Sequence, residues 1–98
     1  MINNKQKLQD AISYQFIEDK FLTRALTHKS YDKTNNNEQL EFLGDRILGL
    51  IIAEKLFSDN KNSNEGLLDK KFSKLVNKLT CAKIAKEISL GDYILLGS

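Results

Sequence analysis

Three acidic residues near the middle of the chain have a spacing that suits chemistry. Glu38, Glu41 and Asp45 stand three and seven positions apart. In an α-helix, where each residue advances by about 100°, they would fall within roughly 60° of one helix face. Two or more carboxylates on one rigid face can bind a hard divalent cation such as Mg2+, which prefers oxygen ligands. A metal-bound water is a better nucleophile, so the spacing is compatible with a hydrolytic metal site.

The same spacing has an ordinary explanation, because any surface helix can place two acids one turn apart. Two features favour the metal. Gly44 would let another backbone or a ligand approach closely beside Asp45. The helix is also apolar on most other sides, which predicts burial, and a buried carboxylate is costly unless it is paired or metal-bound. The opposite face carries Leu40, Leu43, Ile47, Leu50 and Ile51.

The elements that would position these acids are helices. With 98 residues, no proline and few glycines, the chain suits a single all-α domain of about five helices. An asparagine before Glu38 would be a favoured N-cap, and the central helix should be the most enclosed. Gly91 should cap the last helix. The predicted helices are Lys5–Ser13, Glu18–Thr27, Glu38–Phe57, one that opens at Glu65 with an apolar stripe reaching Leu79, and one from Thr80 or Cys81 to Ile88.

The formal net charge is only +2, but its distribution is uneven. The window 70–86 holds six lysines and no acid. Such a stretch can contact phosphates, although a solvated helix face is the plainer interpretation. The candidates for contact with nucleic-acid phosphates are Lys70, Lys71, Lys74 and Lys78.

Other features limit where the protein works. Cys81 is the single cysteine, so no internal disulfide can form, and a reducing cytoplasm is expected. Its apolar neighbours suggest a core thiol. His28 is expected to be a structural hydrogen-bonding partner. The first seven residues contain no apolar leader, and the longest apolar stretch, Ile47–Ala53, is too short to span a membrane. We expect no membrane partner.

The residues around the acids form a recognisable motif. The string closely resembles the signature helix of the ribonuclease III family, and the resemblance extends over essentially the whole chain. The residues that carry it are Asn37-Glu38-Gln39-Leu40-Glu41-Phe42-Leu43-Gly44-Asp45, upstream Ala25-Leu26-Thr27-His28-Lys29-Ser30-Tyr31, and downstream Asn64-Glu65-Gly66, Lys74-Leu75-Val76-Asn77, Leu90-Gly91 and Leu96-Gly97.

The resemblance implies a Mg2+-dependent endonuclease that cuts double-stranded RNA, such as structured rRNA precursors, and leaves 5′-phosphate and 3′-hydroxyl ends. Mn2+ is a possible substitute for Mg2+. Glu41 and Asp45 match metal ligands, and Asp45 also helps to orient the attacking water. Glu38 and Glu65 match supporting acids of the same catalytic valley. Phe42 matches an aromatic residue that inserts into a second subunit of a homodimer.

The resemblance also shows departures. Arg46 stands where a small residue is often found, and it could pair with a neighbouring acid or reach the substrate. No residue matches the second Asp and Glu that complete the family's metal site, and no double-stranded-RNA-binding domain is present. We therefore expect residues 1–98 to be a partial endonuclease domain, inactive by itself. The alternatives are a non-catalytic relative that dimerises and binds RNA, and a generic helical interaction module.

Overall fold

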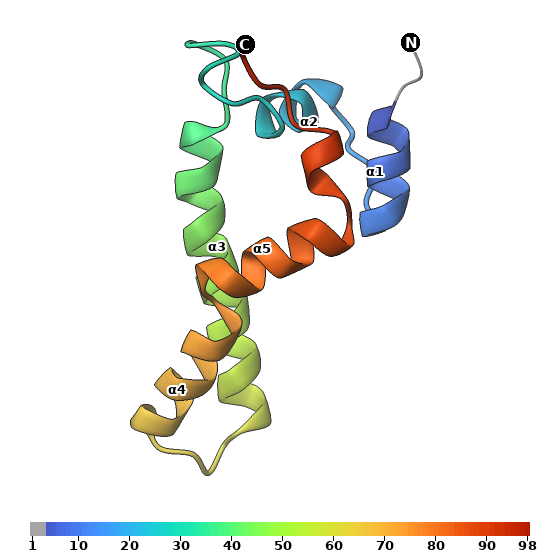
Figure 1. Ribbon diagram of the computed structural model, residues 1–98. Helices are drawn as coiled ribbons and strands as arrows, with labels where there is room; N and C mark the ends of the chain where they lie inside the picture. The colour runs from blue at the N-terminus through green and yellow to red at the C-terminus, as the bar shows by residue number, and fades with distance from the viewer. Residues whose placement is uncertain (1–3) are drawn as a thin grey trace.

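The structure is a computed structural model that describes residues 4–98, so the first three residues of the N-terminal stretch lie outside the described range. Over that range the prediction of an all-α domain is confirmed (Figure 1). Among residues 4–98, the one β-type contact is an isolated parallel bridge between Thr27 and Leu95. The elements are α1 (Asn4–Ile12), α2 (Asp19–Ala25), α3 (Glu38–Asp59), α4 (Glu65–Leu75), α5 (Lys78–Glu87) and the 3-10 turn η1 (Leu90–Asp92).

A small apolar core joins the two ends of the chain. Leu8 of α1 is buried against Leu22 and Leu26 of the α2 region. The core is completed by partly buried residues from the loop after α1 and from the C-terminal part of the chain: Phe16, Ile88, Leu90, Tyr93 and Ile94. We call α1, α2 and residues 88–97 the body of the molecule.

Backbone hydrogen bonds attach the C-terminal segment to the end of α2. The Leu95 N–H donates to the Leu26 carbonyl (2.8 Å), and the His28 N–H donates to the Leu95 carbonyl (2.9 Å). The Gly97 N–H donates to Ser30 Oγ (2.9 Å), which in turn lies 2.7 Å from His28 Nδ1. The prediction that His28 is a structural hydrogen-bonding partner is therefore confirmed, and these bonds hold the matched segments at 28–30 and 96–97 side by side.

Helices α3 and α4 form an arm that extends away from the body (Figure 1). The prediction that α3 would be the most enclosed element is wrong, because none of its residues is buried. Leu50, for example, is 69% exposed. Among the described elements α4 is its main neighbour, and one helix can cover only one side of another. The radius of gyration, 16.1 Å, exceeds the roughly 13 Å typical of a compact domain of this length.

Two turns differ from the sequence prediction. Helix α4 ends at Leu75, and Asn77 is the N-cap of α5 because its side chain accepts the Thr80 N–H (2.8 Å). Lys78 is therefore the first residue of α5, and Leu79 is exposed. Gly91 lies within η1 and does not cap α5; Ser89, with φ of 57°, has the left-handed conformation instead.

In the part of the chain that the structure describes, no helix is both long enough and apolar enough to cross a membrane.

Candidate functional site

The first turn of α3, which carries the candidate acids, is fixed by the end of α2. The Thr27 carbonyl accepts the Asn37 N–H (2.9 Å). Arg24 donates from Nε to the Asn36 carbonyl (3.0 Å) and from Nη2 to Gln39 Oε1 (2.7 Å). These bonds link the body to the arm, so the orientation of the acids depends in part on Arg24 and Asn36, which lie outside the sequence motif.

As predicted, an asparagine side chain accepts a backbone N–H at the start of α3. The residue is Asn36, which is buried: its Oδ1 accepts the Glu38 N–H (3.1 Å), and its Nδ2 donates to the Asp32 carbonyl (3.0 Å). Asn37, the residue just before the helix, makes no side-chain cap. Its backbone already has near-helical angles (φ −86°, ψ −1°), whereas a capping side chain usually needs an extended backbone.

The three acids of the predicted stripe line one groove between α3 and the α4–α5 turn. Its volume is about 920 Å³. Lys78, at the first turn of α5, lines the same groove. The lining residues are Glu38, Glu41, Phe42, Gly44, Asp45, Arg46 and Leu48 on one side and Val76, Asn77, Lys78 and Cys81 on the other.

The helix geometry limits how these acids can act together. Glu41 and Asp45 are one turn apart, about 6 Å along the axis, whereas Glu38 lies roughly 10 Å from Asp45. Within residues 4–98, no three potential ligand side chains gather closely enough to hold one metal ion. Two solvent-facing carboxylates nevertheless fit a Mg2+ ion, which is commonly bound by one or two carboxylates and several waters.

The candidate acids are exposed to solvent, and not buried as predicted. The Asp45 side chain is 69% exposed, so no burial penalty has to be offset by a metal. The expectation that the acids would be buried is wrong for the same reason that α3 as a whole is exposed: α4 covers only part of it. The case for a cation therefore rests on the spacing of Glu41 and Asp45 and on the groove that they line.

Two residues that follow the acids contact each other on the same surface. Phe42 is 61% exposed, as an interface residue would be, and within residues 4–98 it is not among the side chains that pack against the buried core. The Arg46 guanidinium stacks 3.8 Å from the centre of the Phe42 ring. Its Nη1 also lies 3.6 Å from Asp45 Oδ2, so the expected pairing with a neighbouring acid is present.

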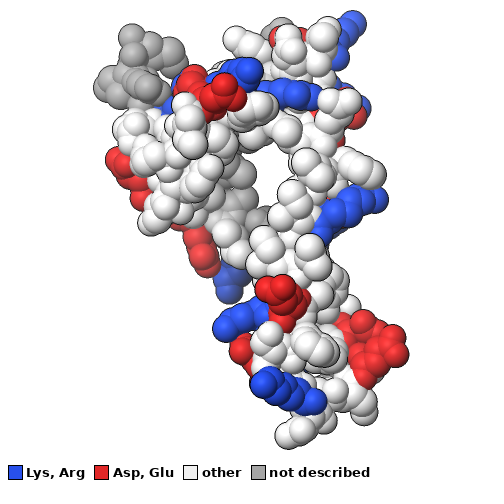
Figure 2. All heavy atoms as spheres, turned by 180° about the vertical axis from the view of Figure 1, so that it is seen from behind, with Lys and Arg blue, Asp and Glu red and all other residues white. Residues whose placement is uncertain are grey.

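Only one of the four candidate lysines lines the same groove as the acids. Lys78 lines the groove, whereas Lys70, Lys71 and Lys74 on α4 do not. Lys71 donates to Asn60 Oδ1 and so helps to close the loop between α3 and α4. On the face drawn in Figure 2, lysines and acids are interspersed along the arm, without a continuous basic patch. RNA contact by the three α4 lysines stays a prediction.

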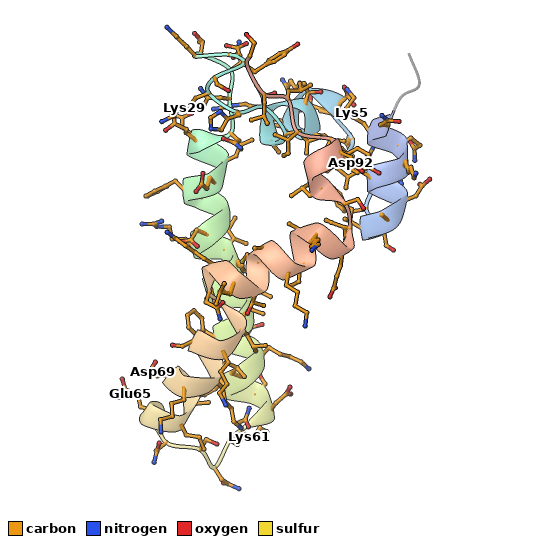
Figure 3. The ribbon with its side chains drawn as sticks, viewed as in Figure 1. Lys5, Lys29, Lys61, Glu65, Asp69 and Asp92 are labelled. Atoms are coloured by element: carbon orange, nitrogen blue, oxygen red, sulfur yellow. The ribbon has the colours of Figure 1, made fainter. Side chains whose placement is uncertain are left out.

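Glu65 occupies a different part of the molecule. It opens α4 at the far end of the arm from Lys29, which lies near the start of α3 (Figure 3). It lines an apolar pocket of about 470 Å³ with Phe57 and Phe72, on a different part of the arm from the other acids. A single chain therefore does not bring Glu65 to the stripe, and its supporting role stays a prediction.

The prediction that Cys81 is a core thiol is wrong. The thiol is exposed and lines the groove, so it is not a core residue. Sequence reasoning missed Asn77 and Cys81 as groove residues because it did not place the helix break at 76–77. The signal was the asparagine itself, a favoured N-cap, which here accepts the Thr80 N–H.

The arrangement of helices places this chain in a class of solved helical domains that are described as nuclease domains. A solved nuclease domain of ribonuclease III from Campylobacter jejuni superposes with a TM-score of 0.92 at 46% identity. The match covers 96% of this chain and 66% of that one, and the published description of that structure concerns flexibility in a region involved in dimer formation. A second structure of the same nuclease domain gives a TM-score of 0.91 at 45% identity.

Sequence comparison identifies the particular family. The model of the Ribonuclease-III-like family matches residues 18–98. Ribonuclease 3 of Pelagibacter ubique is 52% identical over 96 residues, and ribonuclease 3 of Campylobacter jejuni is 45% identical over 95 residues. The chain belongs to the ribonuclease III family. It covers 43% and 42% of the lengths of these two relatives.

Proposed function

We propose that this chain supplies part of the catalytic centre of a Mg2+-dependent endoribonuclease that cuts double-stranded RNA. The observation that carries the proposal is the pair Glu41 and Asp45, which lie one turn apart on a groove wall with Lys78 across from them. Carboxylates alone would repel RNA, whereas carboxylates that hold a cation beside a lysine can accept a phosphodiester. Membership of the ribonuclease III family supports the same chemistry.

Each residue has a distinct part in this proposal. Glu41 and Asp45 hold the cation, Asp45 also orients the attacking water, and Glu38 supports them from the preceding turn. Bound there, Mg2+ or its substitute Mn2+ would act as a Lewis acid and lower the pKa of a bound water. Lys78 neutralises the phosphate that enters the groove. Further phosphates are contacted by Lys70, Lys71 and Lys74.

Recognition of the substrate follows from its shape. Double-stranded RNA exposes phosphates and 2′-hydroxyls in a regular pattern, which proteins read largely without base sequence. The lysines listed above provide charge without a base-reading element. Structured precursors, such as those of rRNA, would therefore be suitable substrates, and the products would carry 5′-phosphate and 3′-hydroxyl ends.

The same proposal includes a homodimer. Exposed Phe42 lies beside the acids, and a large exposed aromatic next to a functional surface suits an interface anchor. Dimer formation is described for the Campylobacter nuclease domain, which shares 46% identity with this chain. In such a dimer Glu65 could approach a site from which it is remote within one chain.

Residues 1–98 alone should not cleave RNA. Two carboxylates can hold Mg2+ together with several waters, but residues 4–98 offer no third protein ligand nearby to fix the position of the ion for catalysis. We propose that this segment is one part of an endonuclease domain whose remaining ligands come from elsewhere. The exposed thiol of Cys81 suits a reducing cytoplasm.

A chimera would test the function directly. Residues 1–98 would be fused to the part of the Campylobacter nuclease domain that this chain does not cover. With Mg2+, the chimera should cleave a labelled RNA duplex and leave the single strand intact. Asp45→Asn and Glu41→Gln should reduce cleavage to the level of the EDTA control, and the isolated chain should show that same level.

Three outcomes would contradict the proposal in whole or in part. A chimera that folds and binds the duplex but never cuts it would favour the non-catalytic dimerisation and RNA-binding module. RNA binding that is unchanged by Mg2+ in every variant would favour a generic helical interaction module. Robust Mg2+-dependent cleavage by the isolated chain would show that its two carboxylates suffice.

A further inference from the structure

Arg46 contacts two residues that have proposed roles but has itself no part in the proposed function. Its Nη1 lies 3.6 Å from Asp45 Oδ2 and donates to the Phe42 carbonyl at 3.3 Å. Its guanidinium lies 3.8 Å from the centre of the Phe42 ring. The planar group is therefore held between a proposed metal ligand and a proposed dimer contact.

We propose that Arg46 is a positioning residue that occupies the Asp45 carboxylate in the metal-free chain and leaves both Asp45 and Phe42 when a divalent cation binds. The inference rests on the proposed cation site. The physical reason is competition: an Asp45 oxygen that faces the guanidinium is less available to a cation, and the cation's charge repels the guanidinium. Both side chains of the pair are more than half exposed, so their attraction is weak and readily broken.

The contact with Phe42 gives this exchange a second consequence. While Arg46 is stacked, one face of the ring is covered by a charged group that would be costly to bury in an interface. Release of Arg46 uncovers the ring. Cation binding at Asp45 and docking of a partner on Phe42 should therefore favour each other, as linkage requires of two events that displace the same group.

Arginine signals offer a readout that does not depend on activity. The sequence has only two arginines, Arg24 and Arg46. Nuclear magnetic resonance of the 15N-labelled chain should give two Nε–H signals. The Arg46 signal should carry a ring-current shift that disappears in Phe42→Leu, which assigns it. Arg24 is the internal control, because its Nε and Nη2 are bonded at the α2–α3 junction.

The experiment is a titration of this chain with MgCl2, followed by Mn2+ binding measured by electron paramagnetic resonance. The Arg46 signal should move toward the position of free arginine as Mg2+ saturates, while the Arg24 signal stays. Arg46→Ala should bind Mn2+ about two- to five-fold more tightly than wild type, which is the range expected on removing a surface ion pair. Arg46→Lys keeps the charge but not the planar stack, so its affinity for Mn2+ should lie between those of wild type and Arg46→Ala.

The outcomes separate this inference from the cation site on which it rests. If wild type and Asp45→Asn bind Mn2+ equally, the proposed cation site fails, and the role of Arg46 fails with it. If wild type binds Mn2+ and Asp45→Asn does not, the cation site stands. The role of Arg46 is then overturned if the Arg46 signal does not move, or if Arg46→Ala binds Mn2+ no more tightly than wild type. Unchanged Arg24 signals would confirm that the Arg46→Ala variant is folded.

Discussion

The body formed by α1, α2 and residues 88–97 buries its central leucines, whereas the arm formed by α3 and α4 leaves most of its apolar side chains exposed. Leu22 in the body is 3% exposed and Leu50 on the arm is 69% exposed, although both are leucines in helices. The difference lies in the neighbours. The body receives side chains from both ends of the sequence, and α3 packs mainly against α4.

This contrast explains how the candidate site is built. The acids lie on the arm, where exposure leaves them accessible to the cation that we propose they hold. Their orientation comes from the body, through Arg24 and Thr27. The buried core of the fold and the surface that we propose for the chemistry thus belong to different parts of the chain, which can be perturbed separately.

The largest expected effect tests the contrast itself. Leu22→Ala should lower the free energy of unfolding by about 2–5 kcal/mol, because it removes buried methyl groups and leaves a cavity. The matched change Leu50→Ala should cost less than about 0.5 kcal/mol, as exposed substitutions usually do. Urea denaturation followed by circular dichroism measures both. A large cost for Leu50→Ala would show that the arm is covered in solution.

The sequence predicted the features that depend on nearby residues. The start of α3 and the shared face of Glu38, Glu41 and Asp45 follow from the periodicity of one helix. The end of α4 was missed because Leu79 continues the apolar stripe, yet Leu79 is exposed and Asn77 starts a new helix. Periodicity shows which residues share a face, but it does not show which face acquires a neighbour.

The candidate site was predicted only in part for the same reason. The acids come from one helix, so their spacing was sufficient to bring them together. Lys78 and Cys81 reach the groove because the chain turns at 76–77, and the four lysines could not be told apart before that turn was known. Phe42 was predicted to lie beside the acids, and its contact with Arg46 follows from their separation of four residues.

Two glycines give the next comparison. A Cβ at Gly97 would overlap the carbonyl oxygen of Ser30, whereas one at Gly44 would meet no atom within 4 Å. Gly97→Ala should therefore destabilise the body by about 1–3 kcal/mol through overpacking. Gly44→Ala should stabilise α3 by about 0.5–1 kcal/mol, since alanine is the better helix former. Thermal unfolding of both variants would show whether stability falls for Gly97→Ala and rises for Gly44→Ala.

The Gly44 variant also tests for a close neighbour on the arm. If Gly44→Ala proves destabilising, or if it weakens self-association in analytical ultracentrifugation, another backbone approaches the helix beside Asp45 in solution. A neutral or stabilising effect on both properties would mean that the space near Gly44 is open, as it is within one chain.

The junction between the body and the arm provides a finer comparison. Asn36→Ala should cost about 1 kcal/mol or more, because it removes the acceptor of the Glu38 N–H and leaves the Asp32 carbonyl without its amide donor. Asn37→Ala should change little, since the Asn37 side chain caps nothing. Chemical denaturation distinguishes them. Equal costs would contradict the assignment of the capping role to Asn36.

The smallest effect is a pH dependence at the same junction. The Asn35 and then the Thr34 backbone N–H groups hold the pKa of Asp32 below its ordinary value, by donating to its carboxylate at 2.9 Å. A carboxyl whose pKa is depressed on folding adds stability that is complete above its unfolded pKa, about 4, and is lost as the pH falls through the folded value. Asp32→Asn keeps an acceptor oxygen but does not titrate.

The difference in melting temperature between wild type and Asp32→Asn should therefore be constant from pH 7 to about pH 5 and should narrow below about pH 4. The pKa of Asp19 is also lowered, chiefly by its hydrogen bond with Lys5, but Asp19 is present in both proteins and its effect cancels in the difference. A constant difference down to pH 2 would mean that the Asp32 charge does not stabilise the loop. The junction would then depend on the hydrogen bonds of Asn36 and Arg24.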